Sequence, residues 1–173
     1  TTWIVGETET TVNVDYGTLP EFDGTPAKDS TAEFDYVFAG WTPEVTEVVG
    51  DATYTAVFTA KIRSYKVTWI TGSGEFTGVW EYGSTPDPDV DGVDTSKPDS
   101  AEAVYTFSHW DKEIAAVTGD VTYTAVYNED VKSYMVTYKI DGEVVHEEMI
   151  KFGSSFNHPA IPEKEGHSSY WNC

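Results

Sequence analysis

The chain has little cysteine, little positive charge and no long apolar run. Its one cysteine, Cys173, has no partner for a disulfide within the chain, so packing and backbone pairing must hold the fold. Only 10 Lys plus Arg stand against 30 Asp plus Glu, and the net charge of −20 argues against binding nucleic acid or anionic membranes. No apolar stretch approaches the roughly 20 residues that a transmembrane helix needs, so no membrane insertion is predicted.

Sequence motifs that carry catalysis are also missing. The chain has no Gly-x-Ser-x-Gly elbow, no phosphate-binding glycine loop ahead of a helix and no His-Glu-x-x-His pair. Its four histidines share no metal-ligand spacing. We therefore predict a protein that is not an enzyme and has no catalytic residues. The chain is nevertheless 39% hydrophobic and 14% aromatic, which is enough to form packed cores.

The most informative feature that is present is an internal duplication. Residues 50–58, Gly-Asp-Ala-Thr-Tyr-Thr-Ala-Val-Phe, return 69 positions later as Gly-Asp-Val-Thr-Tyr-Thr-Ala-Val-Tyr. Other elements recur in the same order, and a Tyr-Gly or Phe-Gly pair marks each copy. These elements are residues 64–69 and 133–138, residues 38–41 and 107–110, and the pairs Tyr16-Gly17, Tyr82-Gly83 and Phe152-Gly153.

The duplication divides the chain into modules 1–63, 64–132 and 133–173. The first module is expected to lack only its first few residues, and the third is a partial or degenerate copy. A module of about 65 residues is near the size at which one core is only marginally stable. The links, residues 59–63 and 128–132, are short and lack glycine and proline, which favours a semi-stiff array. Lys61, Arg63 and Lys132 in these links are interpreted as offsetting the local acidity.

Each module has the pattern of a mainly β fold, α+β at most. Apolar and aromatic residues alternate with polar ones in residues 53–58, 65–69 and 123–127, which is the period of a half-buried strand. Asp141-Gly142 predicts a hairpin between residues 136–140 and 144–150. Residues 84–104 are polar, contain prolines and show no helical period, so they predict a crossover loop with at most a short helical turn.

The sequence motifs, taken in the order in which they occur, resemble the Listeria–Bacteroides repeat, also called the internalin B-type B repeat. They are Tyr-x-Val-Thr-aromatic, Tyr-Gly, Phe-x-Gly-Trp and Gly-Asp-x-Thr-Tyr-Thr-Ala-x-aromatic, and His109 departs from the usual glycine. The stretch 134–171 resembles the front half of the repeat through Asp141-Gly142, Phe152-Gly153, Pro159, Pro162 and Lys164-Glu165-Gly166. The resemblance implies tandem β-grasp-like (ubiquitin-like) modules in an elongated array. It also implies a non-catalytic region of an extracellular bacterial cell-surface protein, often an adhesin.

One candidate site is a series of aspartates in the second crossover loop. Asp87, Asp89 and Asp91 alternate before Gly92, as in the first half of a calcium loop. Pro98 stands at the twelfth position, where a bidentate carboxylate belongs, so an acidic loop without metal is the alternative interpretation. Calcium is the only cofactor that the sequence suggests.

A second candidate is an exposed aromatic ring for ligand binding. Trp41 and Trp110 recur at the same module position, which is typical of buried core residues. Trp80 has no tryptophan counterpart in the first copy and is therefore our first choice for a ligand-binding ring. An intramolecular isopeptide bond from Lys66 is also left open.

Three functions remain open from the sequence. The first is an adhesin stalk or spacer, or a surface interaction module, to which the repetition points. The second is a specific binding module for a glycan or for a protein of the host or of a neighbouring cell. The third is a self-associating fibre subunit in which the open sheet edge of the third module pairs with another chain.

Overall fold

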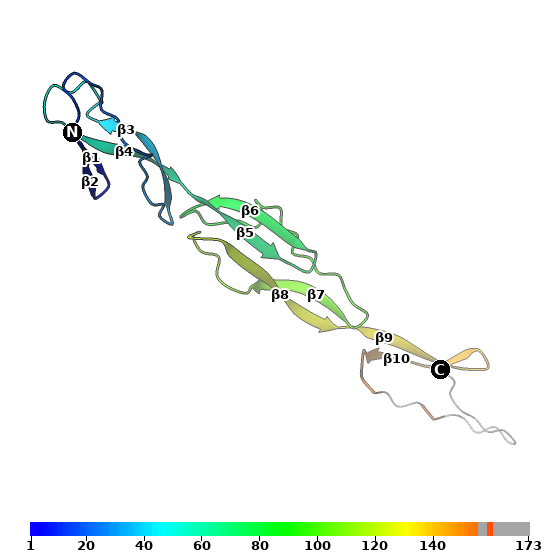
Figure 1. Ribbon diagram of the computed structural model, residues 1–173. Helices are drawn as coiled ribbons and strands as arrows, with labels where there is room; N and C mark the ends of the chain where they lie inside the picture. The colour runs from blue at the N-terminus through cyan, green and yellow to red at the C-terminus, as the bar shows by residue number, and fades with distance from the viewer. Residues whose placement is uncertain (156–158, 161–173) are drawn as a thin grey trace. The chain divides into compact units, whose positions relative to one another are not determined.

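The computed structural model describes residues 1–155 and 159–160, which form ten β-strands and, within these ranges, no helix (Figure 1). The predicted elements at Pro162, Lys164-Glu165-Gly166 and Tyr170-Trp171 lie outside the described residues. In the described ranges, nothing forms a helix long and apolar enough to cross a membrane. The strands are β1 (Thr2–Val5), β2 (Thr8–Thr11), β3 (Phe34–Thr42), β4 (Thr53–Ile62), β5 (Ser64–Ile70), β6 (Glu75–Glu81), β7 (Ala103–Trp110), β8 (Val121–Val131), β9 (Ser133–Ile140) and β10 (Glu143–Lys151).

The first sheet has four strands in the order β2-β1-β4-β3. β1 is antiparallel to β2 and parallel to β4, and β3 is antiparallel to β4. Trp3 on β1 lies opposite Thr10 on one side and Tyr54 on the other. Because a tight turn cannot join parallel strands, the chain reaches β4 through a long crossover that includes β3.

The second four-stranded sheet repeats this arrangement in the order β6-β5-β8-β7. β5 is antiparallel to β6, and β7 is antiparallel to β8. A register shift recurs as well, between Phe38 and Gly40 in the first copy and between Phe107 and His109 in the second. Gly40 adopts a φ of 143° at this place, which favours glycine, whereas His109 occupies the equivalent place in the second copy without a positive φ.

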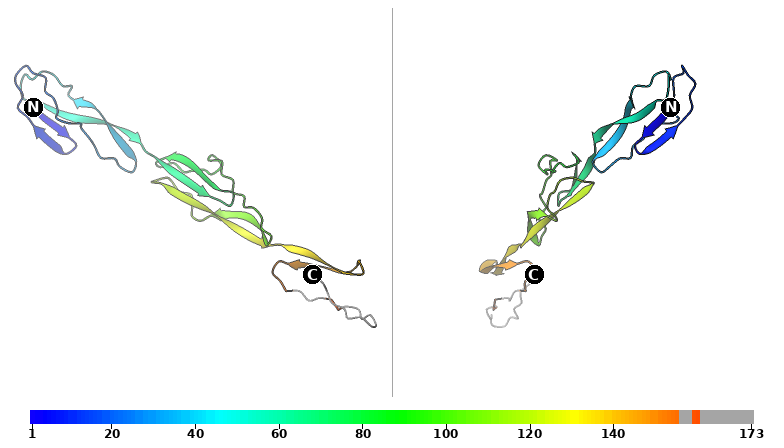
Figure 2. Two further views of the ribbon diagram at one scale, coloured as in Figure 1. Left: turned by 45° about the vertical axis from the view of Figure 1, so that its right-hand side comes forward. Right: turned by 90° about the vertical axis from the view of Figure 1, so that its left-hand side faces the viewer.

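The third module contributes the hairpin of β9 and β10, which both views of Figure 2 show side by side. Asp141 and Gly142 connect these strands with φ of 49° and 90°, the positive values that a tight hairpin turn requires. The predicted hairpin is confirmed. The predicted fold class is also confirmed, because the modules are all-β and form two mixed four-stranded sheets in tandem.

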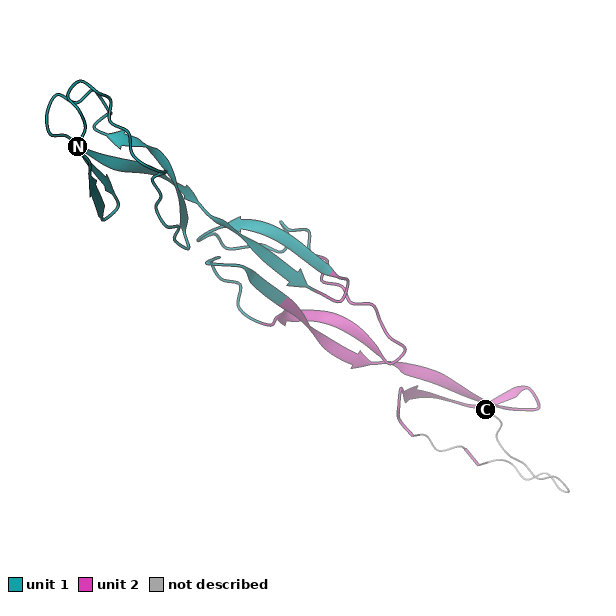
Figure 3. Cartoon of the chain, in the orientation of Figure 1, with its two compact units in different colours: residues 1–70, 75–93, 112–123 teal, residues 71–74, 94–111, 124–173 magenta. Residues whose placement is uncertain are grey.

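The chain divides into two compact units (Figure 3). Unit 1 contains the first sheet, β5, β6 and the start of β8. Unit 2 contains the rest of β8, β7 and the β9–β10 hairpin. Unit 1 consists of Thr1–Ile70, Glu75–Val93 and Lys112–Tyr123, and unit 2 of Thr71–Gly74, Asp94–Asp111 and Thr124–Cys173. The module boundaries stay a prediction from the repeat.

The core of unit 1 consists of aromatic rings on central strands. Trp3 and Trp69 are 2% and 0% exposed, and each packs against the tyrosine of the neighbouring strand, Trp3 on Tyr54 and Trp69 on Tyr123 at centroid distances of 5.0 and 4.7 Å. The predicted core tryptophans are only half-buried, because β3 and β7, which carry Trp41 and Trp110, are edge strands. Among the tryptophans of the described residues, those on β1 and β5 are fully buried.

Candidate functional site

Two of the three candidate aspartates of the second crossover loop, Asp87 and Asp91, accept hydrogen bonds from the protein. The Asp91 carboxylate accepts the indole N–H of Trp69 at 2.7 Å and that of Trp80 at 3.0 Å. Asp87 accepts the backbone N–H of Asp89 at 2.9 Å. Within residues 1–155 and 159–160, no three His, Cys, Asp or Glu side chains gather as a metal site. Calcium binding therefore remains a prediction from spacing.

Trp80, the predicted ligand-binding ring, lies half-buried on β6. Its indole N–H is bound to Asp91, and Gly78 on the same face leaves room for that carboxylate, because a Cβ at Gly78 would overlap it. The first copy has different chemistry here. Phe22, which stands 69 positions before Asp91, packs 5.7 Å from the Trp3 ring, and the buried Trp3 N–H has no hydrogen-bond partner. We call Asp91, Trp69 and Trp80 the Asp91 cluster, and the first module has no such hydrogen-bonded group. Ligand binding at Trp80 stays a prediction.

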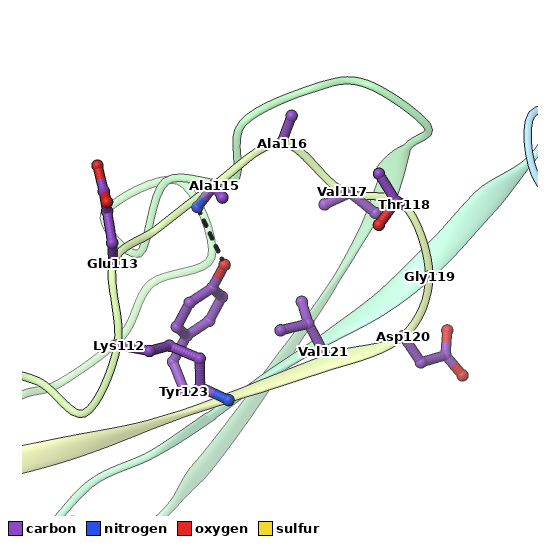
Figure 4. A pocket seen from close by; sticks show the side chains of 10 residues that line it. All are labelled: Lys112, Glu113, Ala115, Ala116, Val117, Thr118, Gly119, Asp120, Val121 and Tyr123. Atoms are coloured by element: carbon purple, nitrogen blue, oxygen red, sulfur yellow. Dashed lines mark hydrogen bonds between the residues drawn. The ribbon is translucent and has the colours of Figure 1, made fainter.

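A hollow of about 290 Å³ lies in unit 1 beside Tyr123, under residues 112–121 (Figure 4). The Tyr123 hydroxyl oxygen accepts the Ala115 N–H at 3.3 Å. In the first copy the Tyr54 hydroxyl likewise binds the backbone of Thr46, at 3.4 and 3.5 Å. Because both copies clamp this loop with the same tyrosine, we assign the hollow to the fold rather than to a ligand. It is also at the small end of the range for ligand pockets.

Arg63 is the single residue between β4 and β5. The contacts around it form a candidate functional site, and the same contacts occur again at the next link. The Arg63 N–H donates to the Glu33 carbonyl at 2.8 Å, and its guanidinium donates to the Thr31 carbonyl at 2.8 Å. The Tyr65 hydroxyl, two residues later, donates to the Ala32 carbonyl at 2.5 Å. The carbonyl of Arg63 accepts the Tyr82 N–H at 2.9 Å. The link residue is therefore bound to the module before it and to the module after it.

The same contacts occur around Lys132, the single residue between β8 and β9. Its N–H donates to the Glu102 carbonyl at 2.8 Å, and its ammonium donates to the Ser100 carbonyl at 2.9 Å. The Tyr134 hydroxyl donates to the Ala101 carbonyl at 2.6 Å. The carbonyl of Lys132 accepts the Phe152 N–H at 2.8 Å.

We call these two sets of contacts the junction clamps, one at Arg63 with Tyr65 and one at Lys132 with Tyr134. The link cations were interpreted as offsetting the local acidity, and Arg63 and Lys132 in addition bind particular carbonyl groups. Each also forms an ion pair, Arg63 with Asp35 at 3.5 Å and Lys132 with Asp99 at 3.2 Å. The signal in the sequence was a cation at the same place in both links of a chain with only 10 Lys plus Arg.

Comparison with known proteins gives one structural likeness. No family model matches the chain, and the comparison with curated proteins gives no match. The chain is similar to the solved structure of "Streptococcal High Identity Repeats in Tandem (SHIRT) domains 3-4 from cell surface protein". The identity is 18%, 72% of this chain and 84% of that chain are covered, and the TM-score is 0.30. From its own sheets and repeats, this chain is a tandem array of small all-β modules.

Proposed function

We propose that the chain is a non-catalytic spacer region of a bacterial surface protein, in which tandem β-modules hold an interaction domain away from the cell. The observation that carries the proposal is the junction clamp, which occurs with the same backbone and hydroxyl contacts at both links. A freely jointed chain of modules has no use for such contacts. A spacer does, because fixed links keep the far end of an array at a distance from its anchor.

The clamp restricts the link through several weak contacts together. Each link has one residue outside the strands, and its N–H and C=O groups are both hydrogen-bonded within the protein. A single hydrogen bond contributes about 0.5–1.5 kcal/mol net, and exposed ones contribute at the low end. Four such contacts, made by the link residue and by the tyrosine two residues later, are enough to disfavour rotation of the link without making it rigid.

Two further features support a surface location. The ordered motifs resemble the Listeria–Bacteroides repeat, whose members form arrays on bacterial surface proteins. The net charge of −20 makes neighbouring copies repel one another, which keeps a densely displayed array soluble and separate. Membership of that family, adhesion and the wall-bound or secreted location are parts of the proposal.

The clamp can be tested by measuring distances across the first link. Spin labels at Thr10→Cys and Thr77→Cys, in a Cys173→Ser background, report the distance distribution by pulsed electron resonance. We expect a narrow distribution that widens in the Arg63→Ala, Tyr65→Phe double variant, because both side-chain contacts to the preceding module are lost.

Tyr16→Phe is the matched control, since the Tyr16 side chain is 81% exposed and lies outside the clamps. It should leave the distribution unchanged. A parent distribution that is already as broad as that of the double variant would refute the spacer proposal.

A second function, ligand recognition by the first module, is favoured by exposed apolar residues, two of which, Leu19 and Val49, correspond to Thr85 and Thr118 in the second module. Tyr16, Leu19 and Val49 are 81%, 60% and 77% exposed, and hydrogen bonds of Val48 with Gly17 and Thr18 bring their two segments together. An exposed apolar group of this kind is typical of interaction sites. A glycan and host-protein array, probed with the chain and with its Leu19→Thr, Val49→Thr variant, tests this function. Signals that both proteins give equally would exclude these residues as the site.

A further inference from the structure

The two four-stranded sheets have four edge strands, β2 and β3 in the first sheet and β6 and β7 in the second. An edge strand presents unpaired N–H and C=O groups, and proteins protect it with shortness, bulges or lysines. β2 has only four residues, and β3 and β7 each contain a register shift. A lysine ammonium also lies over a tyrosine ring of β3 and of β7, Lys28 at 3.8 Å from the Tyr36 centroid and Lys97 at 3.6 Å from the Tyr105 centroid. Three of the four edges are therefore protected.

β6 has none of these protections. Its seven residues, Glu75–Glu81, pair one to one with β5 without a register shift, and they include no proline and no lysine. Val79 on this strand is 74% exposed. The first copy has Asn13 at the equivalent place, three residues before the Tyr-Gly pair, and Asn13 lies beyond the end of β2. β6 is thus a regular edge strand with an apolar side chain left in solvent.

The backbone groups of Thr77 and Val79 point away from β5. The ladder of β5 and β6 continues into a hydrogen bond from the Tyr82 N–H to the Arg63 carbonyl at 2.9 Å. Hydrogen-bonded and non-hydrogen-bonded pairs alternate along an antiparallel ladder, so Thr77 and Val79 belong to non-hydrogen-bonded pairs with β5. No described strand pairs with β6 on its other side, so these N–H and C=O groups face a place where a strand can be added.

The Asp91 cluster supports β6 from its inner face. Trp80 donates its indole N–H to the Asp91 carboxylate at 3.0 Å, and Gly78 leaves the room that this carboxylate occupies. The inward residues of β6 are half-buried, whereas Thr77 and Val79 are exposed. The edge is therefore already extended and fixed from below, which lowers the ordering cost of adding a strand.

Two carboxylates at the ends of β6 determine which strand fits. Glu75 and Glu81 are exposed and lie on the same face as Val79, because side chains two residues apart share a face. Lys66 on β5 lies opposite Val79, so the local charge stays negative. A second copy of β6 is a poor partner, since pairing centred on Gly78 places glutamate opposite glutamate in either direction. A basic strand is favoured by these carboxylates and by the net charge of −20.

We propose that the outer edge of β6 is a docking site for an extended basic segment of another protein. The segment carries Lys or Arg at two positions six residues apart, with β-branched residues between them. It pairs antiparallel with β6, so its two cations lie opposite Glu75 and Glu81, and a β-branched side chain packs on Val79. Hydrogen bonds to the backbone of Thr77 and Val79 hold the segment, and the charge pairs fix its register. This binding goes beyond the spacer function, which does not need it.

The test adds a synthetic peptide, capped at both ends, to the full chain. The probe is Lys-Ser-Val-Ser-Thr-Ser-Lys, which places valine opposite Val79 and threonine opposite Thr77, and the matched peptide has glutamate in place of both lysines. Amide hydrogen exchange followed by NMR reports protection residue by residue. We expect slower exchange at Thr77 and Val79 and no change along β3 and β7. The glutamate peptide should bind at least tenfold more weakly, because two opposite-charge pairs become like-charge pairs.

Variants of the chain test the same site from the other side. The double variant Glu75→Gln, Glu81→Gln should bind the lysine peptide about fivefold more weakly, because both charge pairs are lost. The matched control is Glu44→Gln, Glu47→Gln, which removes the same charge from exposed residues outside β6. We expect the control to keep the parent affinity within about twofold at physiological salt, since separated exposed charges are screened.

Four results would overturn the proposal. They are absence of protection at Thr77 and Val79 at millimolar lysine peptide, equal protection of β3 or β7, equal affinity of the two peptides, and equal loss in the two glutamine variants. The last result would mean that the peptide is attracted by the net charge and not by this edge. The spacer proposal stands in each case, because these measurements leave the junction clamps unaltered.

Discussion

Replacing Asp91 with alanine should destabilise unit 1 by about 2 kcal/mol. The Asp91 carboxylate accepts the indole N–H groups of Trp69 and Trp80, and Trp69 is 0% exposed. Alanine removes this acceptor from the buried Trp69 N–H, and the loss of a buried hydrogen-bond acceptor costs about 1–3 kcal/mol. The Trp80 bond adds less, because both Trp80 and Asp91 are only half-buried. Asparagine keeps an acceptor oxygen, so Asp91→Asn should cost about half as much.

Urea unfolding followed by tryptophan fluorescence measures this change, and hydrogen exchange at Trp69 assigns it to β5. Asp87→Ala is the matched control, because the Asp87 carboxylate accepts only an exposed backbone N–H from Asp89. We expect the control to cost less than about 0.5 kcal/mol, as is usual for exposed sites. If Asp91→Ala costs no more than the control, the two indole contacts do not stabilise the fold and the reasoning is wrong.

Two further predictions concern unit 2 and the glycines. Gly72→Ala should destabilise the turn between β5 and β6 by about 1–3 kcal/mol in urea unfolding, because a Cβ there would lie 2.7 Å from the Lys97 Cα. Gly50→Ala, which meets no atom within 4 Å, should differ little from the parent, and an equal loss in both variants would contradict this explanation. Backbone and hydroxyl hydrogen bonds from Ser96 hold the pKa of Asp94 below its ordinary value. The ionised carboxylate therefore stabilises the folded state at a pH above the ordinary pKa of aspartate, and this stabilisation is lost as the pH falls through the lowered pKa. Ser96→Ala keeps the backbone N–H and removes only the hydroxyl bond, so it should raise that pKa in an NMR titration of the carboxyl carbon, and an unchanged midpoint would count against the hydroxyl hydrogen bond as a cause.

The strands and the repeat could be predicted because their signals are local. Alternation in residues 65–69 identified the buried face of β5, and Val67 and Trp69 are indeed fully buried. Asp141-Gly142 identified a turn because only a few residue types adopt positive φ at low cost. The order of the strands in each sheet could not be predicted from such local signals. It places Trp41 and Trp110 on edge strands, and an edge is defined by partners far away in the sequence.

The junction clamps and the Asp91 cluster were missed for a related reason. Asp91 is 22 positions from Trp69, and Tyr65 is 33 positions from Ala32, so no spacing rule joins them. A comparison of the repeat copies with one another could have identified both the junction clamps and the Asp91 cluster in the sequence. Tyr65 and Tyr134, and likewise Arg63 and Lys132, stand at equivalent places on both links, whereas Asp91 corresponds to Phe22 and therefore marks a difference between modules.

The order of strands also determines how the first module bears tension. The chain enters this module through β1 and leaves it through β4, and these two strands are parallel neighbours in the middle of the sheet. A pull on the two ends of the module drags β1 and β4 along their own length in opposite directions. The hydrogen bonds between them then carry the load at the same time instead of opening one after another, as they do when a hairpin is peeled apart. We therefore expect a module with this strand order to withstand a larger pulling force than a hairpin, even though its core is small.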